Sequence, residues 1–477
     1  MEQLYDMRIL TKKWICGMIT KQGVKTMRQS KRKAAICFVL AGLLLCCAPA
    51  FAFTDTEGHP AEADIDRAVR QGWLSCGAGD RFSPDAALTR GVFVTALAKL
   101  DGADLPPAGH IFSDVPAGRS CARTVQWAVV NGIASGTESG KFSPDQPVTR
   151  EQAAVMLIRH ANYSGVVLPR RRSRTVQFSD LDACSDSGLD ALYTLYRAGI
   201  FDAVDGEIRP ADVMTRADCA VLLRRYQGVC EGTCPDDQRA MVISHMGYSV
   251  EAPENTLEAY ELSDSRNYIY VETDVRFTRD NVPVLLHDET IDRTSNGTGK
   301  VAQMTYQQLQ SFCFDAGKDG YAGTALPTFR QFIQLCAERY LHPYIELKST
   351  VSGKQLEQMS DIVAEYGMAQ HVTWISFDYS NLRSICRRYP QAEVGYVRSY
   401  ADVRTVEQTE QLKTGKNNVY LCAKYTTLTS SVRAQCLRAG IYLEAWTIDE
   451  RRTAVQQLNT SIQGITVDRL TPADIYR

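Results

Sequence analysis

The sequence has no hydrophobic run long enough to cross a bilayer comfortably as a helix. Its apolar run Ala34–Leu45 covers about 12 residues, whereas a transmembrane helix needs about 20, and no long apolar segment follows residue 52. Basic Arg28–Lys33 precedes this run and Ala50-Phe51-Ala52 follows it, which is the order of a secretory signal peptide. We therefore predict that residues 1–52 are an N-terminal extension and a signal peptide cleaved after Ala52, so that no stable membrane span remains. An uncleaved membrane anchor is the alternative.

The sequence also lacks an excess of positive charge. Residues 1–52 hold nine of the 53 Lys and Arg and two of the 55 Asp and Glu, which leaves 44 basic and 53 acidic residues, a net charge near −9, in the rest. An acidic body repels phosphate backbones, so we do not expect nucleic acid as a partner. The cysteines give no metal pattern. Cys230 and Cys234 are spaced for a local disulfide, but no second pair stands at a zinc-site spacing.

The N-terminal half, residues 53 to 230, contains three internal repeats. Phe82–Asp85 and Phe142–Asp145 share the sequence Phe-Ser-Pro-Asp, and Ile208–Asp212 is a degenerate third copy. Each copy is followed by Thr-Arg, which opens an apolar pattern with a helical period. Because threonine is a favourable N-cap residue, each Thr-Arg pair predicts the start of a helix. We predict three helix–loop–helix units that bury their apolar faces against one another.

These units resemble S-layer homology repeats, at about residues 53–105, 106–165 and 175–228. The resemblance implies a secreted protein attached to the anionic secondary polymer in the cell wall of a Gram-positive-type bacterium. It also implies that the arginines of the Thr-Arg pairs, Arg90, Arg150 and Arg216, contact this polymer; ordinary surface arginines at helix starts are the alternative. The basic run Arg170–Arg174 between repeats two and three is typical of a solvated linker. A change of composition at 228–237 marks the predicted domain boundary.

Apolar runs alternate with helical patterns across residues 236–477. Eight runs are predicted strands: 241–245, 269–275, 343–348, 372–377, 393–397, 418–422, 442–447 and 464–467. Eight such units in about 240 residues is the size of a TIM barrel, so the predicted fold class is an α/β TIM barrel preceded by an all-α three-repeat domain. Residues 276–287 are predicted to return as a hairpin arm, because too few residues separate Asp274 from Pro283 for a parallel crossover. Polar, glycine-rich residues 289–327 are predicted to form an insertion over the barrel mouth.

Charged side chains gather at the predicted ends of these strands. The set comprises two pairs spaced two residues apart and two histidines: Glu272 with Asp274, Glu346 with Lys348, and His245 and His287. Residues two apart on a strand share a face, and the carboxyl ends of barrel strands meet at one mouth. Carboxylate oxygens bind Ca²⁺ or Mg²⁺, which neutralises phosphate charge, while histidines supply an acid and a base. The set therefore predicts metal-assisted phosphoryl chemistry.

The same half resembles the glycerophosphodiester phosphodiesterase family. The matching pieces run in order: His245-Met246-Gly247, Pro253-Glu254-Asn255-Thr256, Glu272-x-Asp274, His287-Asp288, Asp292-Arg293-Thr294, Leu326-Pro327-Thr328, Glu346-x-Lys348 and Trp446-Thr447. The resemblance implies hydrolysis of a glycerophosphodiester to glycerol 3-phosphate and an alcohol.

The resemblance also assigns roles to the residues. The implied metal ligands for Ca²⁺ or Mg²⁺ are Glu272, Asp274 and Glu346. His245 and His287 become the acid–base pair, in either order, and Lys348 stabilises charge on the phosphate. The residues expected to order or line the substrate pocket are Glu254, Asn255 and Trp446.

One position departs from the family pattern. Met246 stands where the family has an arginine, between the histidine and the glycine, and methionine offers the phosphate neither charge nor donor. A weak enzyme, a phosphate held by other groups, or a barrel that only binds phosphodiesters would each explain this. Two alternatives to the hydrolase therefore stay open: a wall-binding protein with a non-catalytic barrel, and a related phospholipase D-like enzyme acting on intact lipid.

Overall fold

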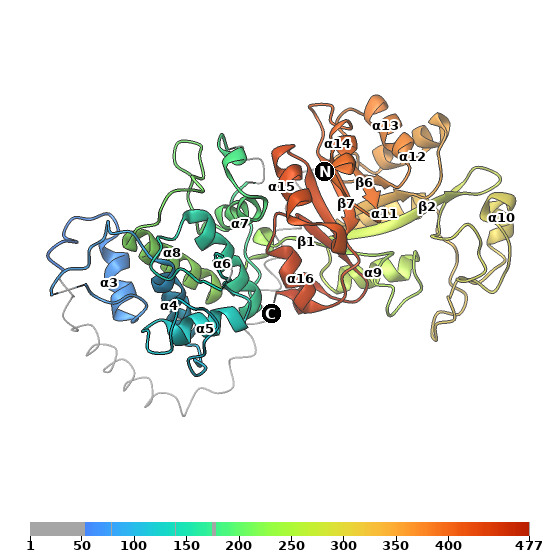
Figure 1. Ribbon diagram of the computed structural model, residues 1–477. Helices are drawn as coiled ribbons and strands as arrows, with labels where there is room; N and C mark the ends of the chain where they lie inside the picture. Colours follow the sequence, from blue (N-terminus) through green and yellow to red (C-terminus); the bar gives the residue numbers. More distant parts are fainter. Residues whose placement is uncertain (1–52, 78, 139, 174–177, 477) are drawn as a thin grey trace, which may run out of the picture. The chain divides into compact units, whose positions relative to one another are not determined.

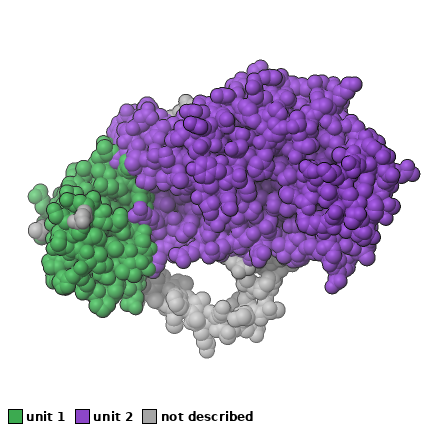
Figure 2. Space-filling view, turned by 45° about the vertical axis from the view of Figure 1, so that its right-hand side comes forward, with its two compact units in different colours: residues 1–156, 211–236 green, residues 157–210, 237–477 purple. Residues whose placement is uncertain are grey.

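The computed structural model describes residues 53–476, except residues 78, 139 and 174–177. The predicted signal peptide and its cleavage site lie outside the described residues. The chain divides into two compact units, one of residues 1–156 and 211–236 and one of residues 157–210 and 237–477 (Figure 2). This division does not follow the predicted boundary near residue 230, because residues 157–210 cluster with the barrel.

A helix begins at each Thr-Arg pair, as the repeats predict. These helices are α4 (Arg90–Asp101), α6 (Arg150–Ser164) and α8 (Arg216–Cys230). The threonine hydroxyl before each one accepts a hydrogen bond from a backbone N–H of the first turn. The remaining repeat helices are α3 (Glu62–Arg70), α5 (Ala122–Val130) and, in the second unit, α7 (Asp186–Arg197). Within the first unit, α3 packs on α8 and α4 packs on α5.

The three repeats share one turn geometry. In each turn a carboxylate accepts hydrogen bonds from two successive backbone N–H groups: Asp55 from Phe82 and Ser83, Asp114 from Phe142 and Ser143, and Asp180 from Ile208 and Arg209. The second residue of each pair is left-handed, with φ of 59°, 57° and 50°. The degenerate third copy therefore folds like the other two. Cys230 and Cys234 are free thiols, so the local disulfide considered from their spacing is absent.

The second unit contains a closed eight-stranded parallel barrel, and this prediction is confirmed (Figure 1). Its strands are β1 (Met241–Ser244), β2 (Tyr270–Phe277), β4 (His342–Leu347), β5 (Thr373–Ser376), β6 (Glu393–Arg398), β7 (Val419–Lys424), β8 (Tyr442–Trp446) and β9 (Gly464–Val467). Each pairs in parallel with the next, and β9 pairs with β1 to close the ring. β3 (Pro283–Leu285) pairs antiparallel with the end of β2, which is the predicted hairpin arm.

Helices cover the outside of this barrel. They are α9 (Leu257–Ser265), α11 (Phe329–Arg339), α12 (Gly353–Glu365), α13 (Tyr379–Arg388), α14 (Val403–Glu410), α15 (Ser430–Arg438), α16 (Arg451–Leu458) and α17 (Pro472–Ile475). The segment 289–327 carries the short α10 (Tyr306–Leu309). Its apolar side chains, which include Ile291, Leu309 and Phe314, share a small core with Val284 and Leu286 of the hairpin arm. In the described part of the chain, no helix has the length and apolar composition that a bilayer crossing requires.

Residues 157–210 contact the barrel through buried polar groups. Asp190 on α7 accepts hydrogen bonds from Arg433 Nε of α15 and from the backbone N–H of Ser461, both at 2.8 Å. Arg170 Nη2 donates to the carbonyls of Leu458 and Ile462, also at 2.8 Å. The prediction that Arg170–Arg174 is a solvated linker is therefore wrong for Arg170, which is buried. Arg170 is only 9% exposed, because its guanidinium satisfies one carbonyl at the end of α16 and one just before β9.

Candidate active site

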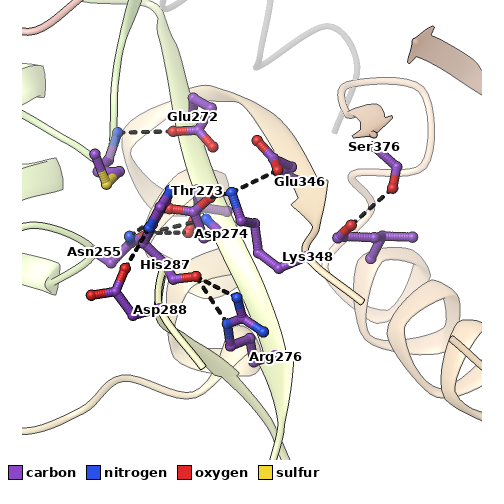
Figure 3. Close-up of polar contacts among 12 residues, drawn as sticks. Asn255, Glu272, Thr273, Asp274, Arg276, His287, Asp288, Glu346, Lys348 and Ser376 are labelled. Atoms are coloured by element: carbon purple, nitrogen blue, oxygen red, sulfur yellow. Dashed lines mark hydrogen bonds and ion pairs between the residues drawn. The ribbon is translucent and has the colours of Figure 1, made fainter. Parts of the chain in front are cut away.

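Three carboxylates meet at the carboxyl ends of two adjacent strands. Glu272 and Asp274 leave β2 and Glu346 leaves β4, and the register pairs Asp274 directly with Glu346. One oxygen from each lies within 4.8 Å of the other two, and the residues are only 4%, 1% and 7% exposed. Figure 3 shows Glu272 and Glu346 facing each other above Asp274. The strand alternation that places 272 and 274 on one face thus brings the predicted triad together.

This cluster concentrates negative charge in a buried position. Burial, and then the charge of Asp274, raise the pKa of Glu272 well above its usual range, and the same two causes raise the pKa of Glu346. Lys348 Nζ lies 2.8 Å from Glu346 and 3.3 Å from Asp274, and supplies one positive charge. Burial would lower the pKa of Lys348, but these carboxylates outweigh it and raise it.

The triad fits a hard divalent metal ion. Glu272 Oε1 is buried and accepts no hydrogen bond among the described residues. Burying such a carboxylate oxygen without a partner is costly, whereas a cation would satisfy it. Three close carboxylate oxygens are the ligand type that Ca²⁺ and Mg²⁺ take, and the larger Ca²⁺ accepts irregular geometry. The residues present therefore suit such an ion.

His245 follows β1 and is oriented by a residue that the sequence did not reveal. Its Nδ1 lies 2.8 Å from Asp468 Oδ1, and its Nε2 lies 3.9 Å from Glu272. A carboxylate can only accept, so Nδ1 carries the hydrogen and Nε2 faces the acidic cluster. Burial alone would lower the pKa of His245, but the bond to Asp468 and the charge of Glu272 raise it to about 9.

His287 ends the hairpin arm and is held at both its ring and its backbone. Its Nδ1 lies 2.7 Å from Asp288 Oδ1, and Arg276 donates to its carbonyl from Nε at 2.9 Å and from Nη2 at 2.7 Å (Figure 3). Asp288 also accepts from Arg293 Nε at 2.7 Å, and this bond is the main reason why the pKa of Asp288 falls to about 2. The ring of His287 therefore contacts an ionised carboxylate.

The first loop supports the acidic cluster through Asn255. Asn255 is buried, with φ of 57°, and its Nδ2 donates to Asp274 Oδ2 at 2.9 Å. Its Oδ1 accepts from Tyr260, Thr273 and the backbone N–H of Asp274. These bonds fix the amide orientation and aim Asp274. The substrate-contact role predicted for Asn255 stays a prediction.

Met246 occupies a strained position in the same loop. Its φ of 54° is left-handed, and its backbone N–H donates to Glu272 Oε2 at 3.0 Å. The backbone at this position therefore orients a carboxylate whichever side chain it carries. Glu254, eight residues on, pairs with Arg293 through both carboxylate oxygens at 2.6 Å.

Two aromatic rings at the carboxyl ends of barrel strands pack against each other. Trp446 ends β8 and its Nε1 donates to the carbonyl of Cys422 at 3.1 Å, which fixes the indole. Phe377 follows β5, is 44% exposed, and packs edge-on to Trp446 with ring centroids 6.1 Å apart. Lys348 Nζ lies 5.9 Å from the centre of the Phe377 ring. An exposed aromatic residue directly after a barrel strand could have been noticed in the sequence.

The side chains of two arginines of the Thr-Arg pairs, Arg90 and Arg216, contact the turns of other repeats. Arg90 is 5% exposed and donates from Nε to the Phe142 carbonyl at 3.1 Å. Arg216 Nε donates likewise to the Phe82 carbonyl at 2.9 Å. The Arg90 guanidinium lies over the Phe142 ring, and the Arg216 guanidinium lies over the Phe82 ring. Each arginine thus holds the turn of another repeat. Arg150 begins α6 and its backbone N–H donates to a carbonyl of residue 212. Contact of these three arginines with wall polymer stays a prediction.

Comparison with known proteins identifies both halves. Residues 245–471 match the glycerophosphoryl diester phosphodiesterase family, and residues 52–91, 111–154 and 177–220 match the S-layer homology domain. The barrel is a glycerophosphodiester phosphodiesterase family domain. Both resemblances predicted from the sequence are therefore confirmed.

Relatives of this phosphodiesterase domain span many organisms. The glycerophosphodiester phosphodiesterase of Caldanaerobacter subterraneus is 26% identical over 236 residues, which are 48% of this chain and 94% of that protein. Glycerophosphodiester phosphodiesterase 1 of Homo sapiens is 34% identical over 131 residues, which are 27% of this chain and 39% of that protein. Among solved structures, an Oleispira antarctica phosphodiesterase in complex with the product sn-glycerol-3-phosphate matches at 25% identity with a TM-score of 0.44, covering 49% of this chain and 94% of that one.

Proposed function

We propose that this protein is a metal-dependent phosphodiesterase, held at the cell wall by its repeats, that hydrolyses glycerophosphodiesters to glycerol 3-phosphate and an alcohol. The observation that carries the proposal is the convergence of Glu272, Asp274 and Glu346 within 4.8 Å, with Lys348 against two of them. Structural carboxylates are rarely buried so close together, since they repel one another without a cation. The family of the barrel and the names of its relatives support this chemistry.

Lys348, His245 and His287 would each have a separate role in the hydrolysis. A bound divalent cation would neutralise negative charge on the phosphate. Lys348 adds a fixed positive charge beside that position. Hydrolysis breaks the bond between phosphorus and the alcohol oxygen, so one proton leaves the attacking water and one reaches the leaving oxygen. His245 and His287 would carry out these two transfers, because their Nδ1 atoms are held by Asp468 and Asp288 and their Nε2 atoms remain for the reaction.

Attachment to the wall is proposed from the repeats. Residues 52–91, 111–154 and 177–220 match a domain associated with cell surfaces, and Arg90, Arg150 and Arg216 begin equivalent helices. A guanidinium suits anionic sugar or phosphate groups of a wall polymer, and contact by Arg90 and Arg216 would use nitrogens other than those that donate to the Phe142 and Phe82 carbonyls. The substrate would then be a deacylated phospholipid head group or a glycerol phosphate link of the wall itself.

A metal-dependent assay tests the catalytic proposal. The purified full chain, given several glycerophosphodiesters, is expected to release glycerol 3-phosphate, to lose this activity in EDTA and to regain it with Ca²⁺ or Mg²⁺. Glu272→Gln keeps the side-chain shape but removes one ligand charge, so it should abolish turnover. Glu365→Gln is the matched control, because Glu365 lies on the exposed surface of α12, in an ion pair with Arg330. Full activity of the wild type in EDTA would refute the metal mechanism.

Met246 favours one second candidate, a barrel that binds phosphodiesters without cleaving them. Loss of a phosphate-clamping group typically costs about 10²–10³ in rate, which is severe but leaves a measurable enzyme. The same assay separates the candidates. Retention of a labelled diester with no product, in the presence of metal, would support the binding protein.

A further inference from the structure

Arg293 is the central residue of a hydrogen-bonded network of charged side chains that starts at the first loop and ends at His287. It lies in the insertion, outside the strands that carry the acidic cluster. Its Nη1 and Nη2 each donate to one oxygen of Glu254 at 2.6 Å, and its Nε donates to Asp288 Oδ2 at 2.7 Å. All three bonds use the planar fork of a single guanidinium. A lysine ammonium could not direct bonds to both carboxylates in this way.

The other oxygen of Asp288 extends this network to His287. Asp288 Oδ1 contacts His287 Nδ1 at 2.7 Å, so the same carboxylate is held by Arg293 on one side and orients the imidazole on the other. Hydrogen bonds to both oxygens leave the carboxylate no freedom to rotate. The hydrogen of His287 is thereby confined to Nδ1, and Nε2 is left for the reacting groups.

We propose that Arg293 is a positioning residue for His287, through which the insertion and the first loop set the orientation and tautomer of this histidine. The inference rests on the proposed function, because it gives His287 a part in the reaction. Arg293 itself touches neither the acidic cluster nor Lys348. Its effect on turnover passes through Asp288.

A simpler role for Arg293 is to attach the insertion to the first loop, and the chain offers a control for it. Lys318, at the other end of the insertion, donates from Nζ to the carbonyls of Ser249 and Val250 in the same loop. It has no bond to Asp288. Lys318→Met therefore weakens the attachment and leaves the contact between Asp288 and His287 in place.

Steady-state kinetics of five variants, four single and one double, test the proposal. Arg293→Met and Asp288→Asn should each lower kcat by about 10- to 100-fold, the usual cost of losing an orienting partner, with KM changed less than about threefold. Arg293→Lys should recover only a small part of the loss, and Lys318→Met should stay within about twofold of the wild type. The double variant Arg293→Met/Asp288→Asn should be no slower than Asp288→Asn alone, because both changes interrupt the same hydrogen-bonded network.

Two kinetic results would overturn the inference. Multiplicative losses in the double variant would mean that Arg293 acts independently of Asp288. An equal loss in Lys318→Met would mean that attachment of the insertion is all that matters.

A second measurement does not depend on turnover. Nitrogen-15 spectra of the full chain, labelled at its seven histidines, report which ring nitrogen carries the hydrogen, and the His287→Asn spectrum assigns the signal. His287 should carry its hydrogen on Nδ1 in the wild type and in Lys318→Met, and should populate the other tautomer in Arg293→Met. Identical His287 signals in all three proteins would overturn the inference. A wild type inactive on every diester would instead count against the proposed function, while the spectra still decide the role of Arg293.

Discussion

Glu444 should make the barrel less stable as the pH rises from acid to neutral. This residue lies on β8 and is only 2% exposed; it accepts hydrogen bonds from Cys422 and Thr466. Burial raises the pKa of its carboxyl from 4.5 to about 7. Between these values the folded state keeps a proton that the unfolded state has released, so the free energy of unfolding falls with increasing pH. The stabilising contribution of the protonated form is complete below pH 4.5 and lost above about pH 7.

The gap between 4.5 and about 7 corresponds to about 3 kcal/mol. Glu444→Gln has the shape and the hydrogen-bonding capacity of the protonated acid but cannot ionise. Relative to the wild type, the variant should therefore gain about 3 kcal/mol of stability between pH 4 and pH 8, whatever its absolute stability. Urea unfolding of both full-length proteins in EDTA, monitored by near-ultraviolet circular dichroism, measures this difference. The contributions of all other titrating groups are the same in the two proteins and cancel. A stability difference that is the same at both pH values would refute the reasoning.

Four further outcomes are expected. Met246→Arg should raise kcat/KM on a simple glycerophosphodiester about tenfold, since it restores a phosphate donor on a backbone already left-handed; steady-state assays decide. Asp468→Asn should lower kcat at least about 100-fold, because His245 loses the carboxylate that fixes its tautomer. Ca²⁺ or Mg²⁺ at 100 times Kd should stabilise the wild type by about 2.7 kcal/mol in thermal unfolding, and Glu272→Gln should lose most of this shift. Asp190→Ala should cost about 3–5 kcal/mol in urea unfolding, because it removes the carboxylate that neutralises the mostly buried Arg433 guanidinium.

The acidic cluster was predictable because local rules place its members. Residues two apart on a strand share a face, so the pairing of Glu272 with Asp274 needed no tertiary information. The short segment before Pro283 excluded a parallel crossover, and β3 is the antiparallel arm that follows from this. The eight strands could be recognised because parallel strands buried on both faces form continuous apolar runs. Local sequence thus determined both the fold and the positions of the charges at its mouth.

The partners that orient these charges could not be found in the same way. Asp468 lies 223 residues from His245 in sequence, and only closure of the ring between β9 and β1 brings them together. Arg293 belongs to a matching motif, but its two carboxylate partners come from different loops. A charged residue in a loop gives no local indication of which distant group it will meet. Orientation of catalytic side chains therefore depends on tertiary contacts that periodicity does not encode.

The organisation of residues 157–210 follows the same principle. A basic run such as Arg170–Arg174 has the composition of a solvated segment, and the repeats before and after it suggested one separate helical domain. Arg170 is instead buried because two carbonyls between α16 and β9 need donors, and Asp190 is buried because Arg433 and a backbone N–H need an acceptor. The third repeat is therefore divided, with α7 packed on the barrel and α8 in the other unit. A fragment that ends near residue 230 would expose the barrel-facing side of α7, so binding to wall polymer has to be measured on the full chain.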